Sequence, residues 1–417
     1  MNPFQTAFKA AFQAPASAPA QRGMTLIELM VAITIALVMS LAIFSTLASS
    51  EGRKRTMTAN NDVGQVGTFA AYQLDKMLRS AGSGFSQSSN FTYGCQLQAN
   101  RTSPGVILPF SGSMSAPFTA MNTALAGGYR LAPLIIYKNA TTPQVSGQSS
   151  DALIVMSGAA GFGEVPTLFT GAATATQLNL TNTVAFQPND LVLMADVNGA
   201  TGPAPCMIQQ VASTFAGSGT AASPVSALPM AGTYTANPIG SVNLTSYTSV
   251  ATALSLGSAT TANPPSFSII GVGADNNLMM YDLLQMGTYN TTLPLADAVF
   301  ELHALYGVDT DNNGTVDTWV DPGTTGYTAA TLESGTAASV ATLQKIKAVR
   351  VGLILRTQLP EKAPATGVAP ATTGPLTLFS DLGSTYTYTR TLGTAEKNYR
   401  YRTVEMTVPL RNALLLN

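Results

Sequence analysis

The strongest feature of the hydropathy pattern is a long apolar span near the N-terminus. From Leu29 to Ala48 there are about twenty residues without a charged side chain, enough for a helix to cross a hydrocarbon core. Beyond this span, apolar residues recur at spacings of three and four. They are Val63, Val66, Phe69, Ala70, Leu74, Met77, Leu78 and Ala81. The pattern predicts one helix over residues 24–81, about 85 Å long, with residues 24–48 in a membrane.

Two glycines interrupt the second half of this helical pattern. Gly64 and Gly67 lower the local helix propensity, so we expect the apolar stripe to be held by packing against a globular domain. Gly82 and Gly84 follow the last apolar position. Glycine is the residue type that most often ends a helix, and the helix is therefore predicted to end near Ala81.

After Phe85 the pattern changes to short apolar runs separated by Gly, Pro, Asn, Ser and Thr, which is typical of strands and loops. The predicted strands are Ala152–Met156, Asp190–Ala195, Met207–Val211, Ser266–Gly271, Leu278–Leu284, Val299–Tyr306, Ala348–Leu355 and Arg402–Pro409. Three Ala/Thr/Ser/Gly/Pro-rich segments, 110–150, 212–265 and 357–395, are predicted to be surface insertions or mobile loops.

Composition narrows the class of protein. The chain has 417 residues, of which 46% are apolar and 10% charged, so it is not a disordered polar tail. Without residues 1–23 it would carry 18 basic and 21 acidic side chains. A formal charge near −3 gives no general surface for nucleic acid.

The apolar span begins with an unusual polar string. Gln21, Arg22, Gly23 and Met24 precede it, and Glu28 stands at its head. A carboxylate in hydrocarbon costs several kcal/mol, so a chain that keeps one there is expected to use it. Two plainer interpretations are a secretory signal peptide ending after Ser50 and a simple single-span anchor. The apolar run is longer than the usual signal core, which disfavours the first.

This string resembles the leader and N-terminal helix of type IV pilins and type II secretion pseudopilins. The resemblance implies that prepilin peptidase cleaves after Gly23 and that Met24 becomes the N-methylated first residue. It also implies that Glu28 pairs with the N-terminal amine of a neighbouring subunit during filament assembly. The basic residues at 53–55, which outnumber Lys9 and Arg22, mildly favour the opposite membrane orientation.

Later segments narrow the resemblance to PilW-type minor pilins. They are residues 71–82 with Cys95 after them, 190–194 with Cys206 and 208–211, 306–311, and 347–356. The family implies an α+β, pilin-like fold in which a long N-terminal helix packs on a mainly antiparallel sheet with long loop insertions. It divides the chain into a leader (1–23), the helix (24–81) and a β-rich periplasmic or extracellular domain (82–417).

The same resemblance implies the function. The protein would be a structural minor pilin that primes type IV pilus assembly and sits at or near the tip. Its implied partners are prepilin peptidase, other minor pilins, the major pilin, a tip adhesin and the inner membrane before assembly. A minor pseudopilin of type II secretion is the alternative, and a membrane-anchored adhesin that never polymerises is a third possibility.

In this topology the two cysteines, Cys95 and Cys206, lie beyond the membrane in an oxidising compartment, where a disulfide is the natural pairing. It would close a loop of about 110 residues. Two buried free thiols are the alternative.

An acidic segment has the first half of a calcium-binding loop. Side-chain oxygens at positions 1, 3, 5 and 9 come from Asp309, Asp311, Asn313 and Asp317, and Thr315 can offer its carbonyl. Position 12 is a valine, which cannot bind a metal ion. The sequence therefore leaves open a calcium clip between two strands or a plain Asp/Asn/Gly turn.

Catalytic chemistry is poorly supported. The chain has one histidine, His303, and two cysteines, which excludes the usual zinc sites and leaves a catalytic triad dependent on one residue. We expect His303 to be structural and the protein not to be an enzyme. Aromatic residues that could line an interface or pack in the core are Trp319, Tyr386, Tyr388, Tyr399 and Tyr401.

Overall fold

A computed structural model describes residues 23–109, 114–121, 128–140, 150–160, 165–196, 204–217, 219–220, 223–261, 263–286, 291–362 and 367–414. The chain divides into two compact units, residues 1–58 and 59–417. Apart from Gly23, the predicted leader lies outside the described residues. The predicted fold class is confirmed, because the structure combines a long apolar N-terminal helix with several mainly antiparallel sheets.

The long helix, α1, runs from Leu26 to Ser80. It ends where Gly82 adopts a φ of 81° and its N–H donates to the carbonyl of Met156. A positive φ is freely available only to glycine, so the residue type at this position fixes where the chain leaves the helix and enters the domain.

Within the second unit, one side of α1 is buried along a stripe with helical spacing. Its buried members are Val63, Gly67, Ala70, Leu74 and Leu78. The predicted stripe is confirmed with one correction. Phe69 is 50% exposed, and Gly67 is buried instead. The side of the helix that faces the domain carries the glycine and not the phenylalanine.

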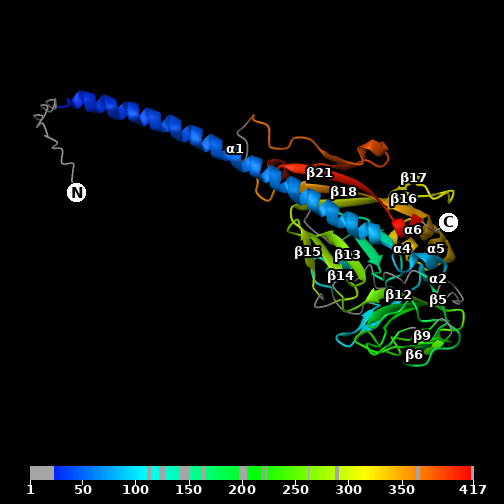
Figure 1. Ribbon diagram of the computed structural model, residues 1–417. Coiled ribbons are helices and arrows are strands. Elements are labelled where there is room, and N and C mark those ends of the chain that lie inside the picture. Colours follow the sequence, from blue (N-terminus) through cyan, green and yellow to red (C-terminus); the bar gives the residue numbers. More distant parts are fainter. Residues whose placement is uncertain are drawn as a thin grey trace, which may run out of the picture. The chain divides into compact units, whose positions relative to one another are not determined.

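The surface beneath this stripe is a four-stranded antiparallel sheet with the order β17-β16-β18-β21. Its strands are β16 (Val299–Val308), β17 (Thr318–Val320), β18 (Ile346–Arg356) and β21 (Tyr401–Pro409). Gly67 faces Leu355 of β18 and Val404 of β21, and β18 and β21 run side by side next to the helix (Figure 1). The predicted strands in this region are confirmed, and β16 and β18 are longer than expected.

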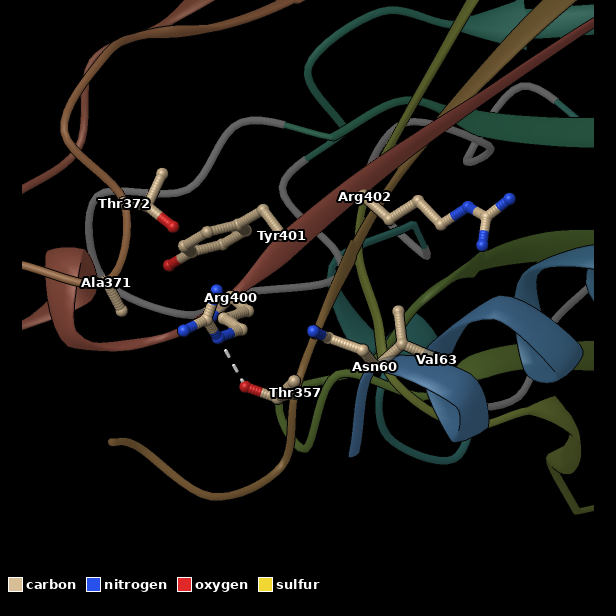
Figure 2. Close-up of a pocket in the computed structure, with 8 residues that line it drawn as sticks. All are labelled: Asn60, Val63, Thr357, Ala371, Thr372, Arg400, Tyr401 and Arg402. Carbon is tan, nitrogen blue, oxygen red and sulfur yellow. Dashed lines mark hydrogen bonds between the residues drawn. The ribbon is translucent and has the colours of Figure 1, made fainter. Parts of the chain in front are cut away.

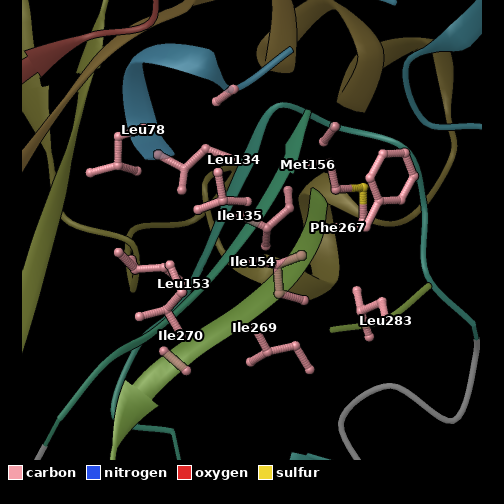
Figure 3. Packing of buried hydrophobic residues seen from close by; sticks show 14 of the residues in the cluster. Leu78, Leu134, Ile135, Leu153, Ile154, Met156, Phe267, Ile269, Ile270 and Leu283 are labelled. Atoms are coloured by element: carbon pink, nitrogen blue, oxygen red, sulfur yellow. The ribbon is translucent and has the colours of Figure 1, made fainter. Parts of the chain in front are cut away.

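A five-stranded antiparallel sheet, ordered β15-β14-β13-β4-β3, forms the middle of the domain. Its strands are β3 (Leu134–Tyr137), β4 (Ala152–Ser157), β13 (Ser266–Val272), β14 (Leu278–Asp282) and β15 (Leu293–Ala296). Figure 3 shows Leu78 from α1 close to Leu134, Ile135 and Leu153 of this sheet. The sheet and the end of α1 therefore share one hydrophobic core.

A six-stranded sheet, ordered β2-β1-β8-β7-β12-β5, forms a further part of the domain. Its strands are β1 (Leu97–Arg101), β2 (Gly105–Leu108), β5 (Thr167–Leu168), β7 (Asp190–Ala195), β8 (Cys206–Gln210) and β12 (Thr252–Ser258). All its pairs are antiparallel except β1 with β8. A separate hydrophobic cluster, which includes Phe169, Phe186 and Tyr247, packs against it.

The remaining elements are short. Two-stranded ribbons are formed by β6 (Gln177–Asn179) with β11 (Ala227–Pro229), β9 (Gly219–Thr220) with β10 (Ser223–Pro224), and β19 (Leu376–Leu378) with β20 (Tyr388–Arg390). The short α-helices are α2 (Ser89–Thr92), α4 (Ala329–Leu332), α5 (Ala337–Lys345) and α6 (Arg411–Leu414). Single 3-10 turns are η1 (Ser86–Ser88), η2 (Phe118–Ala120), η3 (Leu244–Ser246), η4 (Ser380–Leu382) and η5 (Glu396–Asn398).

The prediction that segments 110–150, 212–265 and 357–395 are only surface insertions is wrong for part of each. The first contains β3, and the second contains β12, which lies between β7 and β5. The third contains β19 and β20 and buries Leu378 and Phe379 against β16 and β18. The residues around these elements are mostly small or hydroxylated, so the hydropathy of each whole segment resembles that of a loop, although β3 itself is a run of large apolar residues.

The predicted disulfide is present. Cys95 and Cys206 are bonded, with their Cα atoms 5.6 Å apart. Cys206 opens β8, and β8 pairs in parallel with β1, which begins two residues after Cys95. The bond therefore joins the segment that follows α1 to the six-stranded sheet.

Candidate functional site

The first described residues form a capped helix start. The Oγ1 atom of Thr25 accepts a hydrogen bond from the Glu28 N–H, and Glu28 Oε2 accepts from the N–H and the hydroxyl of Thr25, each at 3.3 Å. This reciprocal pattern is a capping box. Its sequence signature, Thr-x-x-Glu, is present at residues 25–28, and this signal identifies the structural role of Thr25.

Glu28 has a limited set of partners. Its Oε2 atom bonds only with Thr25, and no basic side chain in the described part of the chain forms an ion pair with it. Its Oε1 atom makes no hydrogen bond to any described residue. The capping box therefore holds the carboxylate at the helix start and leaves one oxygen open to a donor from another molecule.

The helix that follows is long and apolar enough to cross a membrane, and its most apolar stretch is not buried against the rest of the described chain. Hydroxyl groups in the span bond to their own backbone, as Thr34 does to Val31 at 2.9 Å and Ser45 to Ala42 at 2.8 Å. Because these polar groups are satisfied within the helix, the outer surface of the span is apolar and can face lipid or other helices.

The acidic loop lies in the turn between β16 and β17. The carboxylates of Asp309, Asp311 and Asp317 offer oxygen atoms that all lie within 4.8 Å of one another. Asn313 is close by, since its N–H donates to Asp309 Oδ1 at 3.1 Å and its side-chain amide to Asp311 Oδ2 at 3.0 Å. The structure thus brings together four of the five residues predicted to bind calcium through side-chain oxygens or a carbonyl.

The fifth residue, Thr315, donates its N–H to Asn313 Oδ1 at 2.8 Å, so that oxygen is engaged within the loop. Asp321, the carboxylate nearest to position 12, instead pairs with Lys138 at 2.6 Å. A ligand set of the full twelve-residue type is therefore not assembled around this turn.

Hydrogen bonds stabilise the charged forms of the loop carboxylates. Burial alone would raise the pKa of Asp309, but backbone N–H groups, including that of Gly314 at 2.8 Å, donate to it and lower the pKa overall. Two hydrogen bonds from Thr310, each 2.7 Å long, lower the pKa of Asp317. The loop therefore keeps these two negative charges close together at neutral pH.

His303 lies in a buried polar cluster. It is 3.4 Å from Glu301 and 3.8 Å from Asp151, and its ring stacks on that of Tyr388 with centroids 3.7 Å apart. Glu301 also pairs with Arg390 at 2.9 Å and accepts from the Tyr388 hydroxyl at 2.9 Å. These contacts join β16 to the β19–β20 ribbon, which is the arrangement of a structural histidine.

A pocket of about 320 Å³ lies between the domain part of α1 and β21. Its lining residues are Asn60, Val63, Thr357, Ala371, Thr372, Arg400, Tyr401 and Arg402. Figure 2 shows Tyr401 directed toward Thr372 and Arg402 directed away from them. Arg400 pairs with Glu361, whereas Arg402 forms no ion pair with any described residue. The pocket therefore offers one uncompensated positive charge beside the helix.

Two regions of the chain match known protein families. The prokaryotic N-terminal methylation motif matches residues 19–44, which include Gly23, Glu28 and the start of the apolar span. With the long helix and the antiparallel sheets, this match makes the chain similar to proteins of the type IV pilin class.

The second match is to type IV pilus-assembly protein W, over residues 269–412. This region runs from β13 to α6 and contains the whole four-stranded sheet. The two matches confirm the resemblance to type IV pilus minor pilins of the PilW family, which is a structural rather than a catalytic family. No curated protein and no solved structure matches the chain.

Proposed function

We propose that this protein is a minor pilin that primes type IV pilus assembly and sits at or near the pilus tip. The observation that carries the proposal is Glu28, held by a capping box at the head of an apolar helix and lacking a basic partner among the described residues. The matches to the methylation motif and to pilus-assembly protein W support a pilin role.

Cleavage after Gly23 would create a new amine on Met24, next to the capping box. Within one chain the carboxylate already bonds to Thr25, and only Oε1 is left without a partner among the described residues. A neighbouring subunit can present its own amine to that oxygen. A charge-assisted hydrogen bond in a low-dielectric helix bundle is stronger than one in water, so the pair would fix the stagger between adjacent subunits.

Before assembly, the apolar helix would hold the protein in the inner membrane with residues 82–417 in the periplasm. In the fibre, contacts with the helices of other pilins would replace the contacts with lipid. The implied partners are prepilin peptidase, which releases residues 1–23, other minor pilins, the major pilin and a tip adhesin.

The test uses two substitutions in the full chain. Replacing Gly23 with a bulky residue should block processing, which a gel shift detects. Glu28→Leu should leave membrane insertion intact and abolish piliation, because insertion depends on the apolar span and assembly on the carboxylate. Glu51→Leu, on the same helix beyond the apolar span, is the matched control and should assemble normally. Normal processing and piliation in both test variants would reject the proposal.

A minor pseudopilin of type II secretion is the alternative within the same class. The match to pilus-assembly protein W favours the pilus. Deleting the gene separates the two: a pilus subunit is needed for twitching and surface fibres, and a pseudopilin for enzyme secretion. An anchored adhesin that never polymerises would tolerate Glu28→Leu in every assay.

We also propose that the acidic loop binds calcium. Three carboxylate oxygens within 4.8 Å of one another repel unless a cation lies between them. Calorimetric titration of the purified full chain with Ca²⁺ should release or absorb heat, and Asp309→Asn should remove the signal. Asp321→Asn is the control, since Asp321 pairs with Lys138. A flat titration of the wild-type protein would dismiss the site.

A further inference from the structure

A surface pocket of about 520 Å³ lies beside β17, the strand that follows the acidic loop in the sequence. Three segments that are distant in sequence form it: the end of β3 with Lys138, residues 318–324, and residues 385–386 before β20. Its lining residues are Lys138, Thr318, Trp319, Val320, Asp321, Gly323, Thr324, Thr385 and Tyr386. We call it the Trp319 pocket, after the only tryptophan of the chain.

Two aromatic rings in the pocket are held in place by packing. Trp319 and Tyr386 are partly buried and both pack against the small core cluster that contains Phe300 and Phe379. Trp319 pairs with Gly307 across β16 and β17, and a Cβ atom on that glycine would lie 3.1 Å from the indole ring. The missing side chain lets the indole lie close to the strand, so the ring is fixed before any ligand arrives.

The polar edges of these rings are open. In the residues that the structure describes, neither the indole N–H of Trp319 nor the hydroxyl of Tyr386 makes a hydrogen bond. A buried core tryptophan or tyrosine usually finds such a partner. Among the described residues both groups thus lack a partner, and each is a donor that a ligand in the pocket could use.

The charged groups in the pocket compensate each other. Asp321 Oδ1 accepts from Lys138 Nζ at 2.6 Å and from the Gly323 N–H at 2.7 Å. Asp321 Oδ2 has no hydrogen-bond partner among the described residues. The side chains of Lys138 and Asp321 are 40% and 38% exposed, so both can reach a ligand while their charges sum to zero.

We propose that the Trp319 pocket binds a neutral sugar, through a pyranose ring that stacks on Trp319 or Tyr386. One face of such a ring carries polarised C–H groups, which are attracted to the negative face of an aromatic ring. Neighbouring hydroxyls both donate and accept hydrogen bonds, and thus match the free oxygen of Asp321 and the ammonium of Lys138.

Other ligand classes fit the pocket less well. An anionic ligand would find the charge of Lys138 already neutralised by Asp321. A wholly apolar ligand would remove water from that ion pair without replacing its hydrogen bonds, which is costly. The proposal goes beyond the assembly function, because sugar binding would not require the protein to be in a filament.

The single tryptophan gives a direct assay. The full chain, purified in a detergent without a sugar head group, is titrated with lactose, maltose, mannobiose and chitobiose while Trp319 emission is recorded. At least one sugar should give a saturable change with a Kd of about 0.1–10 mM, the range of one weak site. The Kd should change little with salt concentration, since no net charge is neutralised.

Two variants with the same assay decide whether this pocket is responsible. Tyr386→Ala and Asp321→Asn should each weaken binding about tenfold or more, a loss of one stacking ring or one charged acceptor. Tyr72→Ala, which removes an exposed tyrosine of α1, is the matched control and should bind as the wild type does. Near-ultraviolet circular dichroism checks that each variant is folded.

Two results would overturn the proposal. One is the absence of a saturable change with every sugar up to about 100 mM, where a site with a Kd of 10 mM would be nearly full. The other is unchanged affinity in folded Tyr386→Ala and Asp321→Asn, which would place the sugar elsewhere on the protein.

Discussion

The contact between α1 and the four-stranded sheet depends on Gly67, and replacing it with alanine tests this packing. A Cβ atom at Gly67 would overlap Leu355 Cδ1 and lie 3.3 Å from Val404 Cγ2. Leu355 is fully buried, so it has no solvent space into which it can move. Gly67→Ala therefore forces the helix away from the sheet.

Gly64 is a matched control on the same helix, one turn earlier. A Cβ atom there would lie 2.6 Å from Arg402 Nη1, at the mobile end of an exposed side chain that can shift at little cost. In both variants the gain in helix propensity is the same, about 1 kcal/mol. The difference between the two variants thus isolates the cost of overpacking.

Overpacking a well-filled core costs about 1–3 kcal/mol. We therefore expect Gly64→Ala to be neutral or more stable than the wild type by up to about 1 kcal/mol. Gly67→Ala should be less stable than Gly64→Ala by about 1–3 kcal/mol, which lowers the melting temperature by several degrees. Thermal unfolding of the detergent-solubilised full chain measures both. If Gly67→Ala is as stable as Gly64→Ala, the helix does not pack on the sheet as described.

For two further changes, the structure determines whether the stability of the fold rises or falls. Replacing Cys95 and Cys206 with alanine should lower the unfolding free energy by about 4–5 kcal/mol for a loop of about 110 residues, and an unchanged denaturation midpoint would contradict this. Burial raises the pKa of Glu333 from its usual 4.5 to about 7. The folded protein therefore binds an extra proton between these values, and its stability falls as pH rises from about 4.5 to about 7. Glu333→Gln should lose less stability over this range than the wild type, as melting curves at several pH values would show, and equal losses in both would refute the assignment.

The sequence revealed several of the strands that contain a run of large apolar residues. The predicted and observed bounds of β7 agree, because its central residues, Leu191–Met194, form one run of large apolar side chains. β12 is not evident in the sequence because only Leu254 and Leu256 of Thr252–Ser258 are large and apolar, and the other residues are small or hydroxylated. Only its position between two other strands shows that these residues are core.

The helix shows a second limit. Hydropathy placed Phe69 in the buried stripe and treated Gly67 as a weak point. In the structure, Gly67 is buried against Leu355 and Val404 of the sheet, and Phe69 is half exposed. A glycine that permits close approach and a glycine that only weakens a helix look the same in a single sequence.

The candidate sites differ in how far apart their residues lie in the sequence. The residues around Glu28 and those of the acidic loop are close together in the sequence, so their spacing alone predicts both sites. The Trp319 pocket joins residues 138, 319 and 386, and no periodicity links positions so far apart. Such a site becomes visible only when the sheets are in place.

The most direct test of the central claim is the mass of the protein isolated from native membranes or sheared fibres. If Glu28 is kept in an apolar helix to meet the N-terminal amine of a neighbouring subunit, the chain must begin at Met24 and carry one methyl group on its amine. We expect intact-protein and N-terminal peptide mass spectrometry to show this form. A chain that retains residues 1–23, or one that begins at Glu51, would contradict the account.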